Sequence, residues 1–190
     1  MNEFIQDKEF KKLDFSKDKL PKGNYEYCRF YDCHFEKGFL DNQHFVECHF
    51  EKCNLTNVNV ANTQFNDVMF DTCKLVGVLF ETCDPLLLNF QFKGCNLSLA
   101  SFYEMKLPNT YFDDCILHQT DFTLSNLTNT KFFNCDLKNA VFERTNLKGV
   151  DFYTAFNFEI DPELNTLTKA KFRQESLIGL LKKYDIVVEH

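Results

Sequence analysis

Tryptophan is absent from this chain of 190 residues, and methionine, proline and glycine are scarce, at 3, 4 and 6 residues. Phenylalanine, in contrast, occurs 23 times. A bias toward one aromatic residue type is typical of a repeated sequence unit. The sequence also contains no glycine-rich loop of the kind that binds phosphate and no G-x-S-x-G hydrolase motif, which disfavours the two corresponding classes of enzyme.

Long hydrophobic runs are also missing. No uncharged apolar run approaches the ~18 residues that span a bilayer, and the first residues, MNEFIQDKEF, are charged, unlike the apolar core of a secretion signal. We therefore expect a soluble, cytoplasmic protein without membrane contact. The 9 cysteines are odd in number, and in that compartment we expect free thiols. The sequence does not show whether the final His190 is native or a tag remnant.

Acidic residues outnumber basic ones, giving a formal net charge of -7. Residues 1–20 and 161–190 are each balanced, so the excess lies in residues 21–160. A negative body disfavours direct binding to nucleic acid, because phosphate requires lysine and arginine. It favours a partner with a basic surface.

Large apolar residues recur every five positions, from Phe15 to Phe80 and then, two residues out of phase, from Leu87 to Phe152. A period of five matches neither a helix nor a strand. A small residue stands two positions before each large one, so two residues in five are expected to point inward. A second period of 20 residues is set by Cys33, Cys53 and Cys73, by Cys95, Cys115 and Cys135, and by phenylalanines at the corresponding spacing. Four pentapeptides therefore make one turn.

A single turn cannot bury its own inward side chains, so successive turns are expected to stack about 4.8 Å apart, like residue on like. About seven turns then form a filled rod roughly 34 Å long. Since such a rod has no cavity, we expect no catalytic residues and no cofactor site. An enzymatic interpretation would require a cleft at residues 83–91, where two additional residues and Pro85 interrupt the period.

Cysteine and histidine lie next to each other at Cys33-His34 and Cys48-His49, as in some zinc sites. In the five-residue frame, however, the cysteines point inward and the histidines point outward, so they do not converge on one ion. We expect no metal site and interpret the cysteines as small buried hydrophobic residues.

Segments such as CNLTN, CDLKN, AVFER and TNLKG resemble the A(D/N)LXX signature of the pentapeptide-repeat family, over residues 15–154. This resemblance implies an all-β fold, a right-handed quadrilateral β-helix with about seven coils of 20 residues and a C-terminal helix. We expect an N-terminal cap over residues 1–14, the β-helix over 15–154, and a C-terminal cap and helix over 155–190.

In the tail, Leu177, Leu180, Leu181 and Tyr184 fall on one helical face, ahead of a short β-rich run over residues 186–188. A helix there must at least cover the open last turn. The Qnr-type (quinolone-resistance) members of the family pair through C-terminal helices. The resemblance therefore implies a homodimer held together by these four side chains.

One side of the expected rod is distinctly acidic. It is the side with inward residues Leu40, Val60, Phe80, Phe102, Phe122 and Phe142. Its acids, opposed by Arg144 alone, are Asp41, Glu81, Glu104, Asp121 and Glu143. A charge run of this kind is also typical of a face that is merely solvated.

Qnr-type proteins resemble a DNA duplex and bind type II topoisomerases, so the resemblance implies a protein that binds DNA gyrase or topoisomerase IV through its acidic side. The alternative is a generic protein-interaction scaffold with another partner, whose acidity serves solubility. A duplex of this length carries on the order of 20 phosphate charges, several times the excess here, so we do not expect a strong mimic. The chain also lacks the long loops that are tied to drug protection in some Qnr-type members, which puts quinolone protection in doubt.

Overall fold

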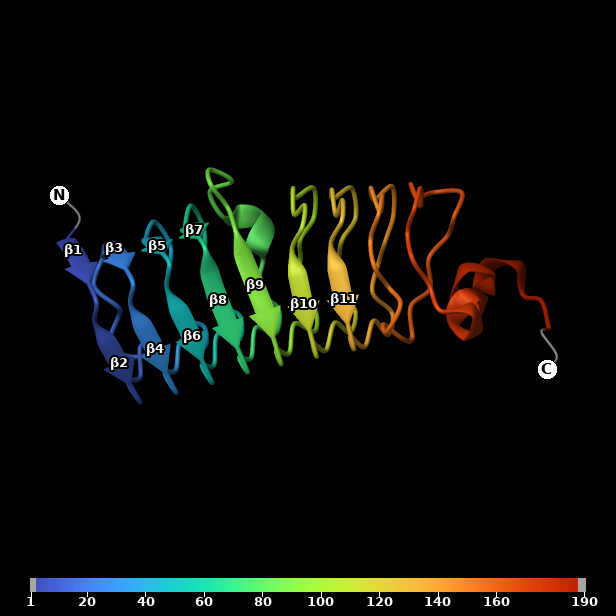
Figure 1. Cartoon of the computed structure of the whole chain (residues 1–190). Coiled ribbons are helices and arrows are strands. Elements are labelled where there is room, and N and C mark those ends of the chain that lie inside the picture. Colours follow the sequence, from blue (N-terminus) through green and yellow to red (C-terminus); the bar gives the residue numbers. More distant parts are fainter. Residues whose placement is uncertain (1–2, 188–190) are drawn as a thin grey trace.

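Parallel pairing between successive coils sets the architecture. The structure is a computed structural model that describes residues 3–187, and it forms an elongated solenoid whose two ends lie far apart (Figure 1). Phe30 pairs with Phe50, and Phe50 pairs with Phe70, so each coil advances by one repeat of the sequence period. The fold is the expected all-β, right-handed quadrilateral β-helix of about 7 turns.

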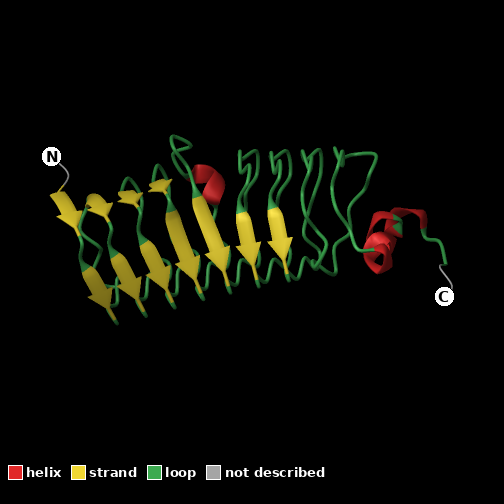
Figure 2. Ribbon diagram, viewed as in Figure 1, coloured by secondary structure: helices red, strands yellow, loops and turns green. Residues whose placement is uncertain are grey.

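The strands form two parallel sheets on neighbouring sides of the solenoid. The shorter sheet contains β1 (Glu3–Gln6), β3 (Gly23–Glu26), β5 (His44–Val46) and β7 (Gln64–Asn66). The longer sheet contains β2 (Glu9–Lys11), β4 (Arg29–Tyr31), β6 (His49–Glu51), β8 (Val68–Asp71), β9 (Phe90–Lys93), β10 (Tyr111–Asp113) and β11 (Lys131–Phe133). The other two sides are joined by single bridges such as Asn54↔Lys74. Figure 2 shows that the coils after β11 continue without strands.

Stacked phenylalanine rings fill the axis of the solenoid. Along the longer sheet, ring centroids of successive coils lie 5.2 Å apart for Phe92 and Phe112 and 5.0 Å apart for Phe112 and Phe132. The small residues two positions earlier are buried as well, and all 9 cysteines are free and buried. Most of their thiols donate to a backbone carbonyl of the preceding coil, as Cys53 does to Phe30 O at 3.2 Å. Each side chain thus packs on its own counterpart, which explains the ladders in the sequence.

Asparagine and aspartate recur at the corners for two physical reasons. The residue before an inward leucine often accepts a hydrogen bond from the backbone two residues on, as Asn126 Oδ1 does from Thr128 N at 3.1 Å. The last residue of each side adopts a left-handed backbone conformation, with φ of +58° at Asn129 and +68° at Gly149. Asparagine and glycine tolerate this conformation better than other residues do. The family signature is therefore a turn signature as much as a core signature.

The two-residue phase slip is present where the sequence predicts it, because Phe70 pairs with Phe92. One detail of the prediction is wrong. Leu87, expected to point inward, is 69% exposed, whereas a large residue, Phe90, is buried at the inward position two residues before Phe92 that a small residue usually occupies. Phe90 pairs with Val68 and begins β9, after the 3-10 helix η1 (Phe80–Thr82) and a loop that projects beyond the neighbouring coils (Figure 1). A phenylalanine buries more apolar surface than a leucine does, so the additional residues are accommodated outside.

The solenoid extends past both of the boundaries drawn from the sequence. At the N-terminal end, β1 and β2 pair with the next coil, and Phe10 stacks on Phe30 at 4.8 Å. At the other end, Lys171 forms a bridge with Asp151, and Phe172 stacks on Phe152 at 5.2 Å. Residues on both sides of the expected 15–154 core thus belong to coils of the same kind.

The expected C-terminal helix is present, as two short 3-10 helices, η2 (Gln174–Leu180) and η3 (Lys182–Tyr184). Gly179 of η2 lies against the last coil, where a Cβ atom would come within 2.4 Å of Phe158 O. Its carbonyl accepts a hydrogen bond of 3.0 Å from Ile160 N. Residues 186 and 187 of the expected β-rich run form no strand in the part of the chain that is described. Val188 and His190 lie outside the described residues.

Candidate functional site

The residues of the acidic side predicted from the sequence lie above one another on one side of the solenoid. Parallel bridges join Leu79 to Ser101, Ser101 to Asp121 and Asp121 to Val141, so these coils are neighbours on one face. We call this side, whose inward residues run from Leu40 to Phe142, the acidic face. Its five predicted carboxylates occupy three different environments.

Asp41, at the N-terminal end of the acidic face, is neutralised by a lysine of the preceding coil. Lys22 Nζ lies 2.9 Å from Asp41 Oδ2, and Asn42 donates to the same oxygen at 2.7 Å. Burial alone would raise the pKa of Asp41, but the hydrogen bonds from Lys22 and Asn42 outweigh it and lower the pKa. The carboxylate is charged but already paired, so it offers little to a partner.

Asp121 has a structural role in its own coil. Its Oδ1 accepts a hydrogen bond of 2.8 Å from Thr123 N, which is the corner interaction found elsewhere in the solenoid. An aspartate at this position is therefore accounted for by the turn. Counting charges in the sequence could not separate this aspartate from one placed for binding.

Glu81, Glu104 and Glu143 remain as carboxylates that the turn chemistry does not explain. Glu81 lies in η1 and Glu104 on the next coil, and the two line the same groove of about 580 Å³ beside the insertion. Oε2 of Glu81 is buried without a hydrogen-bond partner. A hydrogen bond with Glu104, together with its charge, raises the pKa of the neighbouring Tyr103. Glu143 lies farther along, on the coil of Phe142.

Exposed apolar residues lie among these acids, and the charge count missed them. Leu79 is 51% exposed, and Tyr103, Leu124 and Val141 are each close to 40% exposed. Large apolar residues at outward positions of the five-residue frame are the sequence signal that could have found them. A face that mixes carboxylates with exposed apolar side chains suits a protein surface better than it imitates a row of phosphates.

The tail residues predicted to pair subunits do not share one environment. Leu180 and Leu181 are half-buried, with Leu180 packed on the core, whereas Leu177 is 41% exposed and Tyr184 is 49% exposed. The Tyr184 hydroxyl donates to Glu163 at 2.9 Å. The tail thus covers the last coil with one part and exposes apolar side chains with the other.

Ion pairs hold this tail onto the end of the solenoid. Lys183 Nζ lies 2.6 Å from Asp161 and 2.7 Å from Glu163. Hydrogen bonds from Lys183 lower the pKa of both carboxyl groups. Since depressed carboxyl pKa values contribute stability that is lost as pH falls through them, the attachment of the tail is weakened by acid.

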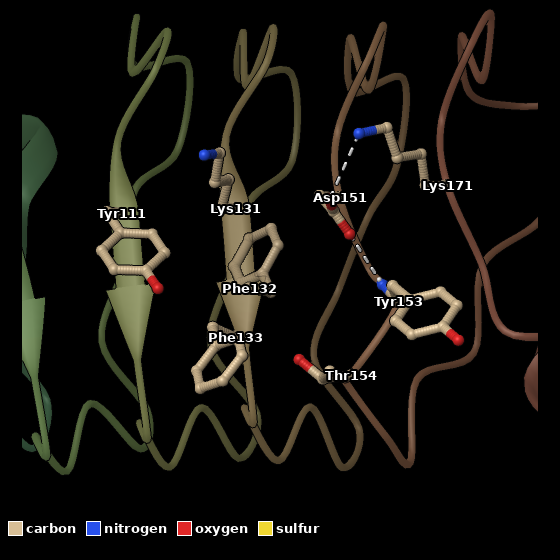
Figure 3. A pocket seen from close by; sticks show the side chains of 8 residues that line it. All are labelled: Tyr111, Lys131, Phe132, Phe133, Asp151, Tyr153, Thr154 and Lys171. Carbon is tan, nitrogen blue, oxygen red and sulfur yellow. Dashed lines mark hydrogen bonds and ion pairs between the residues drawn. The ribbon is translucent and has the colours of Figure 1, made fainter.

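A second groove, of about 430 Å³, lies on the longer-sheet side toward the C-terminal end, and the sequence reasoning did not anticipate it (Figure 3). Tyr111, Phe133 and Tyr153 come from successive coils and present their rings on this outer face (Figure 3). Lys171 Nζ lies 3.5 Å from Asp151 Oδ2 beside them. None of the residues that line this groove carries a buried polar atom without a partner.

Cysteine and histidine form no metal centre in the described part of the chain. Within residues 3–187, no group of three or more His, Cys, Asp or Glu side chains could hold a metal ion. The cysteine side chains are turned inward, as the frame predicts, whereas His34 is exposed. Within the same residues, no helix is long and apolar enough to cross a bilayer.

The fold and its surface define a class of protein: a filled four-sided solenoid that presents long flat faces. Family models for pentapeptide repeats match residues 40–71 and, as a pentapeptide repeat region, residues 86–155. The two matches lie on either side of the insertion. The chain belongs to the pentapeptide-repeat family.

Solved structures of the same fold resemble the whole chain. Two trypsin-treated variants of QnrB1, a plasmid-mediated fluoroquinolone resistance protein, match with TM-scores of 0.65 and 0.64 at 18% and 14% identity. The alignments cover 99% and 98% of this chain and 92% and 100% of those chains. HetL, a pentapeptide-repeat protein involved in heterocyst differentiation regulation from the cyanobacterium Nostoc, matches at a TM-score of 0.47 and 13% identity over 90% of this chain and 88% of its own. No curated protein sequence matches. At these identities, the likeness to the two QnrB1 structures establishes the fold.

Proposed function

We propose that this protein is a non-catalytic cytoplasmic binding protein that holds a basic surface of a protein partner on its acidic face. The observation that carries the proposal is the group Glu81, Glu104 and Glu143, three carboxylates that neither a turn nor an ion pair accounts for. The apolar side chains between them supply the buried area on which a protein interface depends.

A type II topoisomerase, DNA gyrase or topoisomerase IV, is the partner we propose first. The fold likeness to QnrB1, a fluoroquinolone resistance protein, motivates this choice. The pairing of Asp41 with Lys22 and the use of Asp121 in a turn leave fewer free charges than the sequence count suggested. Binding would therefore rely on apolar contact as well as charge, rather than on close imitation of DNA.

Charge reversal on the acidic face tests the proposal. The variant Glu81→Lys, Glu104→Lys, Glu143→Lys should lose inhibition of gyrase supercoiling or relief of fluoroquinolone poisoning shown by the parent at tens of micromolar. A matched variant, Asp32→Lys, Asp113→Lys, Asp114→Lys, makes the same change of net charge on the longer-sheet side and should retain the effect. If the parent protein has no effect on gyrase or topoisomerase IV, the topoisomerase part of the proposal fails.

A generic scaffold with another partner is the second candidate, supported by the aromatic groove of Figure 3, which lies on a different side. A scaffold that uses this groove would keep its partner after charge reversal on the acidic face. It would lose the partner when Phe133 and Tyr153 are both changed to serine. The two candidates thus predict opposite results for the same pair of variants.

We also propose that the protein is a homodimer joined through its tail, because Leu177 and Tyr184 remain exposed after the tail has covered the last coil. Removing the chain from Lys171 onward would strip away Phe172, which stacks on Phe152, so a point variant is the cleaner test. Leu177→Glu should convert a dimer to a monomer in light scattering. A parent protein that is monomeric, or a variant that stays dimeric, would contradict this.

A further inference from the structure

The insertion between η1 and β9 opens the filled solenoid on the acidic face. Pro85 and Leu88 of the insertion form one wall of the groove of about 580 Å³, and Met105 of the next coil forms another. Regular coils stack like on like, whereas here one wall of the groove is formed by residues that have no counterpart in the neighbouring coils. The groove therefore exists because the two additional residues displace the chain outward at this coil.

An unpaired carboxylate oxygen distinguishes this groove from the other surface hollows. Buried side-chain oxygen or nitrogen atoms without a partner occur at Asn24, Gln43, His49 and Glu81 in the described chain. Of these residues, Glu81 lines the groove beside the insertion. A carboxylate oxygen that has lost its water and gained no donor is unfavourable, so a rotation of the Glu81 side chain toward a donor placed in the groove would be favourable.

In the described part of the chain, no lysine or arginine pairs with this oxygen. Lys106 lines the groove, but none of the ion pairs within residues 3–187 joins it to Glu81 or Glu104. Cys83, which is 7% exposed, also lines the groove. Burial and then the charge of Glu81 raise the pKa of this thiol, in keeping with a carboxylate close by.

We propose that this groove receives an arginine side chain of the protein partner. The apolar stem would lie along Leu88 and Met105, and the guanidinium would donate to Glu81, with Glu104 adding a second negative charge. Tyr103, 39% exposed at the rim, offers a ring face for the cation. Arginine fits better than lysine because its guanidinium is less strongly hydrated, binds a carboxylate through two parallel hydrogen bonds and stacks on aromatic rings. This inference rests on the proposed binding by the acidic face and identifies one contact within it.

Methionine methyl signals provide a direct test, because the chain has 3 methionines and Met105 lines the groove. In protein labelled with 13C at the methionine methyl groups, N-acetyl-arginine amide should shift the Met105 signal saturably at concentrations on the order of ten millimolar, as suits so small a ligand. Met69, on β8, is the internal control and should not move. N-acetyl-citrulline amide has the same shape without the charge and should shift Met105 at least about fivefold less, since charged hydrogen bonds are the stronger ones.

Two variants complete the test. Glu81→Gln should remove the difference between the arginine and citrulline compounds, whereas Asp114→Asn, which removes one charge from another side, should preserve it. An unchanged Met69 signal reports that each variant is folded. Equal shifts with both compounds, no shift at Met105, or full discrimination in Glu81→Gln would each overturn the proposal. A different result would separate the two proposals. If the parent protein binds the arginine compound but the triple variant Glu81→Lys, Glu104→Lys, Glu143→Lys still binds the partner, the proposed function is refuted and the arginine site is retained.

Discussion

Side chains pack differently in the regular coils and in the insertion at residues 83–91. In the regular coils each side chain lies on a copy of itself, as Phe112 lies between Phe92 and Phe132. At the insertion Leu87 has no counterpart in the core, and Phe90 takes the inward position. The regular packing fills the interior, whereas its interruption produces a groove lined by a carboxylate that has an unpaired buried oxygen. The interrupted coil is therefore the place where we propose specific recognition.

Removing a ring from the regular stack should have the largest effect on stability. Phe112 is fully buried, so Phe112→Ala is expected to lower the free energy of unfolding by about 3–5 kcal/mol in urea titration. Leu87→Ala, at the exposed insertion, should change it by less than about 0.5 kcal/mol. Comparable losses in both variants would mean that Leu87 belongs to the core after all.

Thiol reactivity should also differ between the insertion and the regular coils, although this effect is expected to be smaller. Cys83 beside the insertion is 7% exposed, and the other cysteines are at most 1% exposed. Burial is the first cause that raises the pKa of Cys48, to about 12, so this thiol is almost entirely protonated at neutral pH. We expect Cys83 to react with a thiol reagent on the order of tenfold faster than the others through local opening. Cys83→Ala should remove the fast phase and Cys115→Ala should not.

The interior could be predicted from sequence because packing there repeats. Phe70 and Phe92 occupy one column across the phase slip, as their spacing indicates. The conformation of the insertion could not be predicted, since a period describes only the residues that keep it. Whether Leu87 also points inward depends on how much space the ring of Phe90 leaves between the neighbouring coils.

The acidic face could be predicted only in part. Its column of carboxylates follows from the period, but the ion pair between Asp41 and Lys22 and the turn at Asp121 depend on local geometry. The buried oxygen of Glu81 depends on the shape of the insertion. Charge counting therefore found a column of carboxylates that lies on one side of the solenoid, and it overestimated the charge available there.

Gln43, inside the regular coils, departs from their pattern, and replacing it should stabilise the protein. Gln43 is fully buried, and neither polar atom of its amide has a partner. At the equivalent position one coil on, Thr63 donates to Leu40 O at 2.7 Å. Gln43→Thr should therefore donate to Leu20 O and raise the free energy of unfolding by about 1 kcal/mol.

Gln43→Val serves as the control for this gain, because it removes the unpaired amide without making the hydrogen bond. Its stability in the same titration should lie between those of the parent and the threonine variant. A threonine variant no more stable than the valine variant would show that the coil cannot bring Leu20 O within reach of the new hydroxyl.

The smallest expected effect concerns a corner of a regular coil. Leu99 has φ of +60°, a left-handed conformation that is unfavourable for leucine, and its side chain is 56% exposed. Leu99→Asn should raise the free energy of unfolding by roughly 0.5–1 kcal/mol, because asparagine tolerates this conformation and little buried surface is lost. Leu86→Asn makes the same exchange in the insertion, at a residue that is 61% exposed and has no positive φ, so its effect on stability should be close to zero. If both exchanges stabilise equally, the gain comes from removing exposed leucine, and the backbone strain assigned to the coil corner is not its cause.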